Sequence, residues 1–476
     1  MAGTSDAADP LDDYNVVWNT PSRDHNGSMP TGNGETGLNL WAEPGGDLVF
    51  LVSRTDSWDG NERLCKLGRV RIKFTPSLAG ADFKQTLKLR QGEIEIVGGA
   101  GDAAVTVRVW VDANRQVAHV EAHSAKDFQM QVALETWRNQ QRVLGLEEAH
   151  GVYGFNGPIT VYPDTVLGGQ DNRIAWYYRN TISTWKGTLE LQHLQPAIKI
   201  GTDPLLHRTF GGVIRGKGLL SVDDRTLKSA KPGKRMEVSL YTETVIPATE
   251  SQWLAAVEKN IAAAEAVPPD EARAAHRKWW NDFWNRSWIR VTGNRAAEAT
   301  TRGYVLQRWI NACGGRPAIV PAEGRRVDRV GEGENPELYA VFPFRIYGRG
   351  KPELEMARHT FAHRGIKCNR GWCQDDTQAA FLGLAGVARN YVSGRATNKH
   401  RGSRFPAFWG PNHDWIPDQD HGGNLMMALQ TMVLQADNGK ILVLPAWPKE
   451  GTWTSSCTPR KTPPWKGACA AASWKT

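Results

Sequence analysis

The side chains best suited to chemistry gather between residues 404 and 450, where carboxylates and imidazoles are interspersed with aromatic rings. Carboxylates, amides and imidazoles bind sugar hydroxyls, and flat rings cover sugar C–H faces. The stretch then turns at Gly422 and Gly423 into a segment with the apolar period of a helix. We therefore expect a carbohydrate site here. The candidate contacts are Trp409, Asn412, His413, Asp414, Trp415, Asp420 and His421.

The acidic residues of this stretch also admit simpler roles. Asp418 lies just before the expected helix, where a carboxylate caps the free N–H groups of the first turn. Capping and catalysis by Asp418 are compatible. Asp414, Asp418 and Asp420 could instead bind calcium, but their spacing is not that of an EF-hand loop and Pro417 interrupts them. We predict no metal site.

The rings of this stretch have alternatives as well. Trp409 and Trp415 flank the acidic residues and are the candidate stacking platforms, with core packing as the alternative. His413 and His421 could bind hydroxyls or be hydrogen-bonded loop histidines.

Composition excludes several classes of protein. The chain has 476 residues, 40% hydrophobic and 23% charged, which is ordinary for a globular protein of two domains. The net charge of +8 comes without a nucleic-acid motif, so we expect no nucleic-acid partner. No run approaches the ~20 apolar residues of a membrane helix, and no cofactor is expected. The six cysteines form no C-x-x-C pair and are too sparse for a disulfide framework.

The period of the sequence changes near residue 249. Before it, strand alternation dominates, as in Val105, Val107, Val109 and Val111, with Gly and Asn clusters between the runs. Beyond it, helices are predicted at 297–312, 353–363, 375–391 and 423–435. We expect a disordered N-terminus (1–13), an antiparallel β-sandwich (14–248), a helical linker (249–295), a partial helical domain (296–450) and an irregular tail (451–476). The turn of Gly32, Asn33 and Gly34 is expected to be structural.

Two motifs resemble a known family. Residues 29–42, MPTGNGETGLNLWA, are similar to the signature LPLGNGRLGAMVFG of glycoside hydrolase family 95, the α-L-fucosidase and α-L-galactosidase family. Residues 416–447, with IPDQDHGG and GKILVLPAWP, resemble its FQIDGNFGG and LLPALP elements. The sequences of these motifs are closer to those of an uncharacterised bacterial family of secreted, glycosidase-like proteins, and the chain is identified as a member of that group.

The resemblance implies a fold and a reaction. The fold would be a β super-sandwich, a linker and an (α/α)6 barrel of the six-hairpin glycosidase type, and the reaction would be inverting hydrolysis of α-glycosides in an oligo- or polysaccharide. Asp418 falls on the family's base-activating Asp. Asp420 and His421 replace its Asn and Phe, and Asn335 and Glu337 replace sugar-contacting His residues, which puts fucose specificity in doubt. Glu337 is the only carboxylate near a family motif that could serve as the acid.

The chain also departs from the family by an absence. The family's general-acid segment has no counterpart between the first barrel helices and residue 334, and about 180 residues hold roughly seven helices, too few for a twelve-helix barrel. We infer an internal deletion near 317–333 and an out-of-frame tail after residue 450. The alternative to an impaired hydrolase is a non-catalytic carbohydrate-binding or remnant protein. Family resemblance predicts an extracellular or periplasmic location, and the sugar, linkage and oligomeric state stay open.

Overall fold

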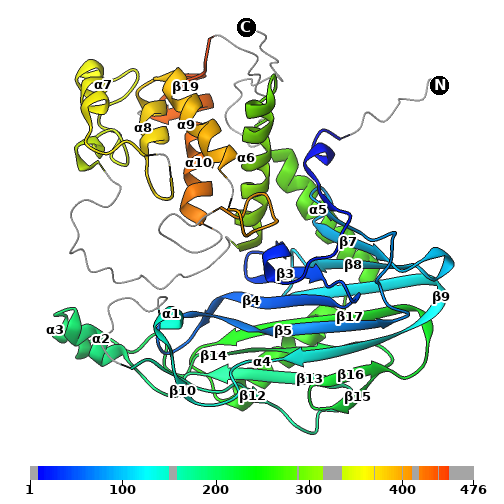
Figure 1. Cartoon of the computed structure of the whole chain (residues 1–476). Coiled ribbons are helices and arrows are strands. Elements are labelled where there is room, and N and C mark those ends of the chain that lie inside the picture. Colours follow the sequence, from blue (N-terminus) through cyan, green and yellow to red (C-terminus); the bar gives the residue numbers. More distant parts are fainter. Residues whose placement is uncertain are drawn as a thin grey trace. The chain divides into compact units, whose positions relative to one another are not determined.

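The computed structural model describes residues 9–149, 158–286, 289–314, 335–368, 370–398, 400–409, 418–437 and 439–449 (Figure 1). The chain divides into two compact units, Met1–Trp280 with Ile310–Val327, and Asn281–Trp309 with Asp328–Thr476. The first unit is mostly antiparallel sheet and the second mostly helix. The expected order of a β-sandwich followed by a helical domain is therefore confirmed.

Two antiparallel sheets in the first unit share one long strand, β9 (Val117–Glu135). Its first half pairs with β8 and β17, and its second half with β5 and β16. The first sheet has the order β1 (Val16–Trp18), β6 (Lys84–Lys88), β7 (Glu93–Gly98), β8 (Val105–Val111), β9, β17 (Gly233–Val245), β14 (Thr209–Arg215), β13 (Arg173–Arg179) and β12 (Thr165–Val166). The second contains β2 (Met29–Gly32), β3 (Thr36–Ala42), β4 (Leu48–Trp58), β5 (Leu64–Thr75), β9, β16 (Thr226–Ser229) and β15 (Leu219–Asp223).

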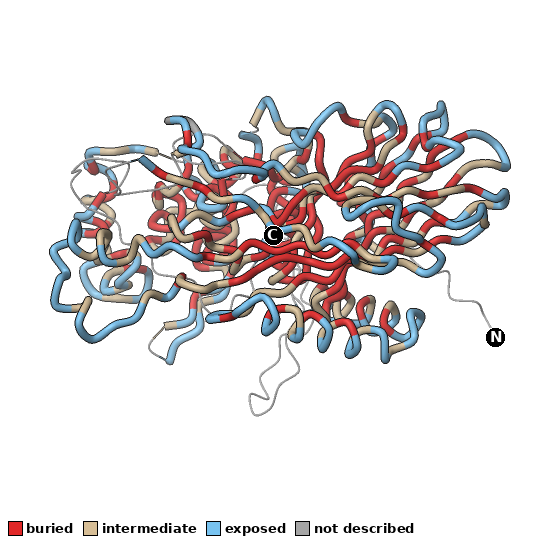
Figure 2. Tube along the Cα trace, turned by 90° about the horizontal axis from the view of Figure 1, so that it is seen from below, coloured by how far each residue is buried: buried red, intermediate tan, exposed pale blue. Residues whose placement is uncertain are grey.

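Strand alternation places the core between the sheets. On β9, Val120 and Ala122 are buried before three exposed residues at 125–127, and Met130 and Val132 are buried after them. The exposed residues 125–127 mark the point where β9 passes from one sheet to the other. The apolar side chains of β9 on either side of this point face the core. Buried residues run along the strands, and exposed residues lie on the peripheral turns (Figure 2).

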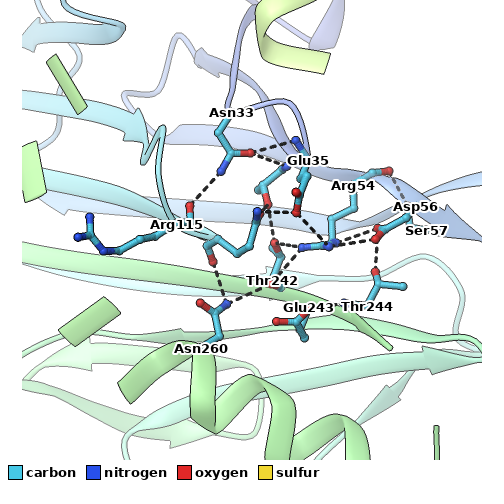
Figure 3. Close-up of polar contacts among 12 residues, drawn as sticks. Asn33, Glu35, Arg54, Asp56, Ser57, Arg115, Thr242, Glu243, Thr244 and Asn260 are labelled. Carbon is cyan, nitrogen blue, oxygen red and sulfur yellow. Dashed lines mark hydrogen bonds and ion pairs between the residues drawn. The ribbon is translucent and has the colours of Figure 1, made fainter. Parts of the chain in front are cut away.

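A buried polar cluster joins the sheets near the Gly-Asn-Gly turn (Figure 3). Arg54 on β4, 4% exposed, holds Asp56 through two hydrogen bonds of 2.9 and 3.0 Å and donates to the carbonyl oxygen of Thr242 on β17 at 3.2 Å. Asn33 accepts from the backbone N–H of Thr36 and donates to the carbonyls of Asp112 and Arg115. Gly34 has a φ of 96°, so the structural role expected for this turn is confirmed.

Helix α4 (Glu250–Glu265) covers the face of the first sheet that is turned away from the second. It begins with a capping box between Thr249 and Gln252 and buries Trp253, Val257 and Ile261. These side chains pack with apolar residues of β13, β14 and β17, among them Ala175, Val213 and Tyr241. The apolar side of this helix therefore faces the sheet.

Helix α5 (Pro269–Arg286) is tied to the same sheet by charge. Glu93 on β7, 2% exposed, accepts hydrogen bonds from Arg273 and Arg277 at 2.8 to 3.1 Å. His276 is fully buried; its Nδ1 accepts from the backbone N–H of Ala113, so Nε2 carries the proton that bonds the Gly92 carbonyl. Burial lowers the pKa of His276 to about 4 and keeps the ring neutral.

Short elements complete the first unit. They are η1 (Asp12–Tyr14), η2 (His25–Gly27), η3 (Gly101–Ala103), β10 (Arg142–Val143), β11 (Thr160–Val161), α1 (Leu146–Ala149), α2 (Trp185–Leu191) and α3 (Gln195–Ile198).

The second unit holds the later helices and one hairpin. They are α6 (Arg295–Gly314, which the division crosses), η4 (Pro336–Leu338), α7 (Leu354–His363), α8 (Asp375–Phe381), α9 (Ala385–Thr397), α10 (Gln419–Val433), β18 (Leu434–Asp437) and β19 (Lys440–Val443). From Pro269 on, the described residues form six α-helices, about half the number in a twelve-helix barrel. Within the described ranges, no helix is long and apolar enough to span a bilayer.

Two predicted helices differ from those observed. The helix predicted over 375–391 is broken, because Gly383 adopts a left-handed φ of 71° and α8 ends at Phe381. The helix predicted over 423–435 begins earlier, at Gln419, because Asp418 caps it; it ends at Val433, where β18 follows. The predicted segments at 297–312 and 353–363 are confirmed by α6 and α7.

Candidate functional site

Asp418 lies at the N-cap of α10, with one carboxylate oxygen engaged and one not. Its Oδ1 accepts from the backbone N–H of His421 at 2.9 Å, and its own N–H donates to the Trp409 carbonyl at 2.8 Å. The residue is 1% exposed, and its Oδ2 has no hydrogen-bond partner within the described parts of the chain. The capping role expected for Asp418 is confirmed, and its second oxygen remains available for a ligand or water.

His421, on the first turn of α10, also has one polar atom without a partner. Its Nε2 lies 3.1 Å from the carbonyl oxygen of Arg395, which only accepts, so Nε2 carries the proton. Nδ1 is then an acceptor, and it is buried without a partner among the residues that the structure describes. Burial lowers the pKa of His421, so the ring stays neutral at physiological pH.

Trp409 closes one side of this cluster. Its ring lies 5.3 Å from that of His421, and its indole N–H donates to Gln307 Oε1 at 3.0 Å. The amide of Gln307 in turn donates to Gln419 on α10. A Cβ at Gly422 would lie 1.9 Å from Gln307 Oε1, which explains a glycine at this position. Trp409 is thus buried and hydrogen-bonded, and its stacking role stays a prediction.

A buried ion pair lies next to the cluster of Asp418, His421 and Trp409, because the Arg395 carbonyl bonds His421. Arg395 on α9 and Asp376 on α8 are fully buried, with Nε and Oδ2 2.6 Å apart. Arg395 also donates to the carbonyls of Gly371 and Cys373. Burial raises the pKa of Asp376, and the guanidinium opposes that rise. No sequence pattern predicted this pair; the adjacent carboxylates at the start of α8 were the only local signal.

A second ion pair lies next to the first. Arg364 Nε is 2.5 Å from Asp375 Oδ1, and both side chains are buried. The segment between them carries a disulfide, Cys368–Cys373, which links residues on either side of the turn before α8. Ion pairs therefore tie the start of α8 to Arg364 and to the end of α9, and the disulfide closes the turn before α8. Helix α10 packs against both α8 and α9.

Asp420, Asn335 and Glu337 differ in their surroundings. Asp420 is exposed on the first turn of α10. Asn335 is buried, and both ends of its amide bond the backbone of Ile366, at 2.8 and 3.0 Å. Glu337 is exposed on η4, which packs with α7, and the described residues show no hydrogen bond or ion pair between it and Asp418.

Four of the predicted contacts, Asn412, His413, Asp414 and Trp415, lie outside the described residues. In the described ranges, no group of three or more His, Cys, Asp or Glu side chains could hold a metal ion. The alternative of a calcium site at Asp414, Asp418 and Asp420 includes Asp414, which lies outside the described residues.

What the described cluster can do follows from its two open acceptors. A buried acceptor that makes no hydrogen bond costs about 1–3 kcal/mol, so Asp418 Oδ2 and His421 Nδ1 favour a ligand or water that donates to them. Sugar hydroxyls and water are such donors.

Comparison with known proteins gives a family and distant structural relatives. The family model described as a domain of unknown function, DUF5703, matches residues 17–289. A protein from the human microbiome designated a kojibiose phosphorylase aligns with 62% of this chain and 41% of its own, at 13% identity and a TM-score of 0.36. A bacterial glucoamylase complexed with acarbose aligns with 63% of this chain and 44% of its own, at 9% identity and a TM-score of 0.29. The chain thus spans less than half of either relative. No curated protein matches it.

Proposed function

The chain belongs to the DUF5703 family, and on that premise we propose that it is a carbohydrate-active protein whose saccharide site lies at the start of α10. The observation that carries the proposal is a pair of buried acceptors, Asp418 Oδ2 and His421 Nδ1, that have no hydrogen-bond partner among the described residues and lie beside the ring of Trp409. Donation by a hydroxyl or a water molecule would satisfy both atoms.

The proposed reaction is inverting hydrolysis of an α-glycoside of the fucoside or galactoside type, probed first with α-L-fucosides and α-L-galactosides. Asp418 would accept a proton from the attacking water through Oδ2, while Oδ1 stays fixed by the N–H of His421. His421 Nδ1 would accept from a hydroxyl. Glu337 is the proposed acid, because protonation of the leaving oxygen needs a second carboxyl group across a gap that holds a water.

A non-catalytic saccharide-binding role is the second candidate. It is favoured by the exposed position of Glu337 on η4, without a described contact to Asp418. In this role Asp418 and His421 would bind hydroxyls, and no acid would be needed.

We further propose an extracellular or periplasmic location. The Cys368–Cys373 disulfide supports it, since such bonds persist chiefly in oxidising compartments.

Two substitutions at one position separate chemistry from capping. Asn is as good an N-cap as Asp, so Asp418→Asn removes the carboxylate and keeps the cap, whereas Asp418→Ala removes both. Hydrolysis is followed with aryl α-L-fucosides and α-L-galactosides and by release of reducing sugar from polysaccharides, with NMR of the first anomer formed. If Asp418 is the base, Asp418→Asn loses about 10²–10⁴-fold in rate at unchanged stability.

The controls decide between the two candidates. Asp24 caps η2 by accepting from the N–H of Asn26, so Asp24→Asn is the same chemical change outside the site and should leave the rate unchanged. Glu337→Gln should also abolish hydrolysis if Glu337 is the acid. Full activity in Asp418→Asn would exclude the base role. Saccharide binding without hydrolysis by the wild type, lost in Asp418→Asn at unchanged stability, would establish the binding role.

A further inference from the structure

A small cavity at the opposite end of α10 from Asp418 has four cationic side chains in its lining. It has a volume of about 180 Å³ and lies within the second unit, between residues 345–352, the end of α8 and the β18–β19 hairpin. Its charged lining is Arg345, Arg349, Lys351, Lys440 and Asp437, with the ring of Phe381 on one side.

The charges of this lining do not balance. Lys351 forms an ion pair with Asp437, and Arg345 Nη2 lies 3.9 Å from the same carboxylate. The lining therefore holds four cations and one carboxylate, a net charge of +3. Like charges around one small cavity repel one another, and an anion between them would relieve that repulsion.

Arg345 is held in place at a cost in backbone strain. Its φ is 56°, a left-handed conformation that costs a non-glycine residue about 1–2 kcal/mol. Its guanidinium lies 4.9 Å from the centre of the Phe381 ring, and Nη2 donates to the Ala436 carbonyl at 2.9 Å. Its Nε is buried and has no hydrogen-bond partner in the described part of the chain. An acceptor in the cavity would supply one.

Carbonyl bonding explains only part of this arrangement. Arg349 donates to the Pro445 carbonyl and Lys351 donates to the Arg345 carbonyl. These two cations therefore also provide hydrogen-bond donors for backbone carbonyl groups near the cavity. Lys440 is different: its backbone pairs with β18, but its side chain is exposed, and its ammonium group makes no hydrogen bond or ion pair with another described residue. Within the described part of the chain, the Lys440 charge at the cavity therefore has no structural partner.

We propose that this cavity binds an oxyanion, a sulfate or phosphate group, either free or as an ester on a saccharide. Guanidinium groups match the geometry of such oxygens with paired N–H donors, and lysine adds a mobile charge. A cavity of about 180 Å³ suits a single group of this size rather than an extended polyanion. The site is independent of the proposed chemistry at Asp418.

Two variants with opposite expected effects test the proposal in the full-length chain. Binding of sodium sulfate and of sodium phosphate is measured by calorimetry at constant ionic strength set with NaCl. Lys440→Gln should weaken binding at least about tenfold, because a charge-assisted hydrogen bond to the anion is lost while no described hydrogen bond or ion pair of the lysine side chain is broken. Asp437→Asn should tighten it several-fold, because a competing carboxylate is removed. Lys367→Gln, an exposed lysine of the same unit outside the cavity, is the matched control.

The outcomes are decisive in either direction. Sulfate or phosphate binding no stronger than that of chloride, equal loss in Lys440→Gln and Lys367→Gln, or weaker binding in Asp437→Asn would each overturn the proposal. Sulfated, phosphorylated and neutral oligosaccharides then identify the source: an ester-bearing ligand should bind and compete with the free ion, whereas binding of the ions alone points to a free anion. Loss of hydrolysis in Asp418→Asn does not affect this result.

Discussion

Replacing Glu93 by Gln tests how strongly charge ties α5 to the first sheet. Burial opposes ionisation of Glu93, but hydrogen bonds from Arg273 and Arg277 outweigh it and lower its pKa from 4.5 to about 2. At 1.36 kcal/mol per pKa unit, this shift corresponds to about 3 kcal/mol of stability at neutral pH. Solvent screens the pair of Glu93 and Arg273 little, because their side chains are 2% and 17% exposed, whereas Arg277 is 43% exposed and its share of the stabilisation is smaller.

The sign of the pH dependence follows from the lowered pKa. Below pH 4.5 the unfolded chain binds a proton that folded Glu93 resists, so the stabilisation is full above pH 4.5 and is lost as pH falls towards 2. Glu93→Gln should therefore be about 3 kcal/mol less stable than wild type at pH 7. By pH 3 the gap should have shrunk by about 2 kcal/mol.

The assay must report on this unit of a two-unit chain. Urea unfolding followed by tryptophan fluorescence between pH 3 and 7 gives the free energies, and hydrogen exchange of α5 peptides assigns the transition. Glu258→Gln is the control, because Glu258 pairs with Arg173 while 46% of its side chain is exposed; it should cost less than about 1 kcal/mol. A gap below 1 kcal/mol at pH 7, or one that does not change with pH, would refute the reasoning.

Two further predictions concern buried contacts. Arg395→Met should destabilise the second unit by about 3–5 kcal/mol, because it leaves Asp376 buried and unpaired. The double variant that also carries Asp376→Leu should recover most of this lost stability. A double-mutant cycle in urea measures both effects, and additive losses would contradict the pairing. Gly92→Ala should cost more than about 3 kcal/mol in urea unfolding, because its φ is 69° and a Cβ would lie 2.1 Å from the Trp280 ring. Gly169→Ala has a similar φ of 68° but open space around it, so equal losses in both would rule out the clash.

Features that depend on local sequence were predicted well. Alternation in Val105, Val107 and Val109 determined the strand β8, because successive side chains of a strand point to opposite faces. The capping of α10 by Asp418 also followed from residue type and position. The break after Phe381 was missed, because the helical pattern continues through Gly383 and only the backbone conformation of that glycine ends α8.

The tertiary structure decided which polar atoms are satisfied. The sequence named Asp418, His421 and Trp409, but only the folded arrangement buries them and leaves two acceptors without a partner among the described residues. The sugar contact predicted for Asn335 stays a prediction; what the folded structure adds is that its amide bonds the backbone of Ile366, thirty-one residues away along the chain.

The same division explains the ion pair and the cation cavity. Arg395 and Asp376 are 19 residues apart, and Arg345 and Lys440 come from segments further apart still, so no local pattern announces them. Sequence periodicity is a property of neighbours along one chain and determined strands, helices and caps. Burial, pairing of charges and open hydrogen-bonding atoms depend on which distant segments meet, and only the folded arrangement specifies that.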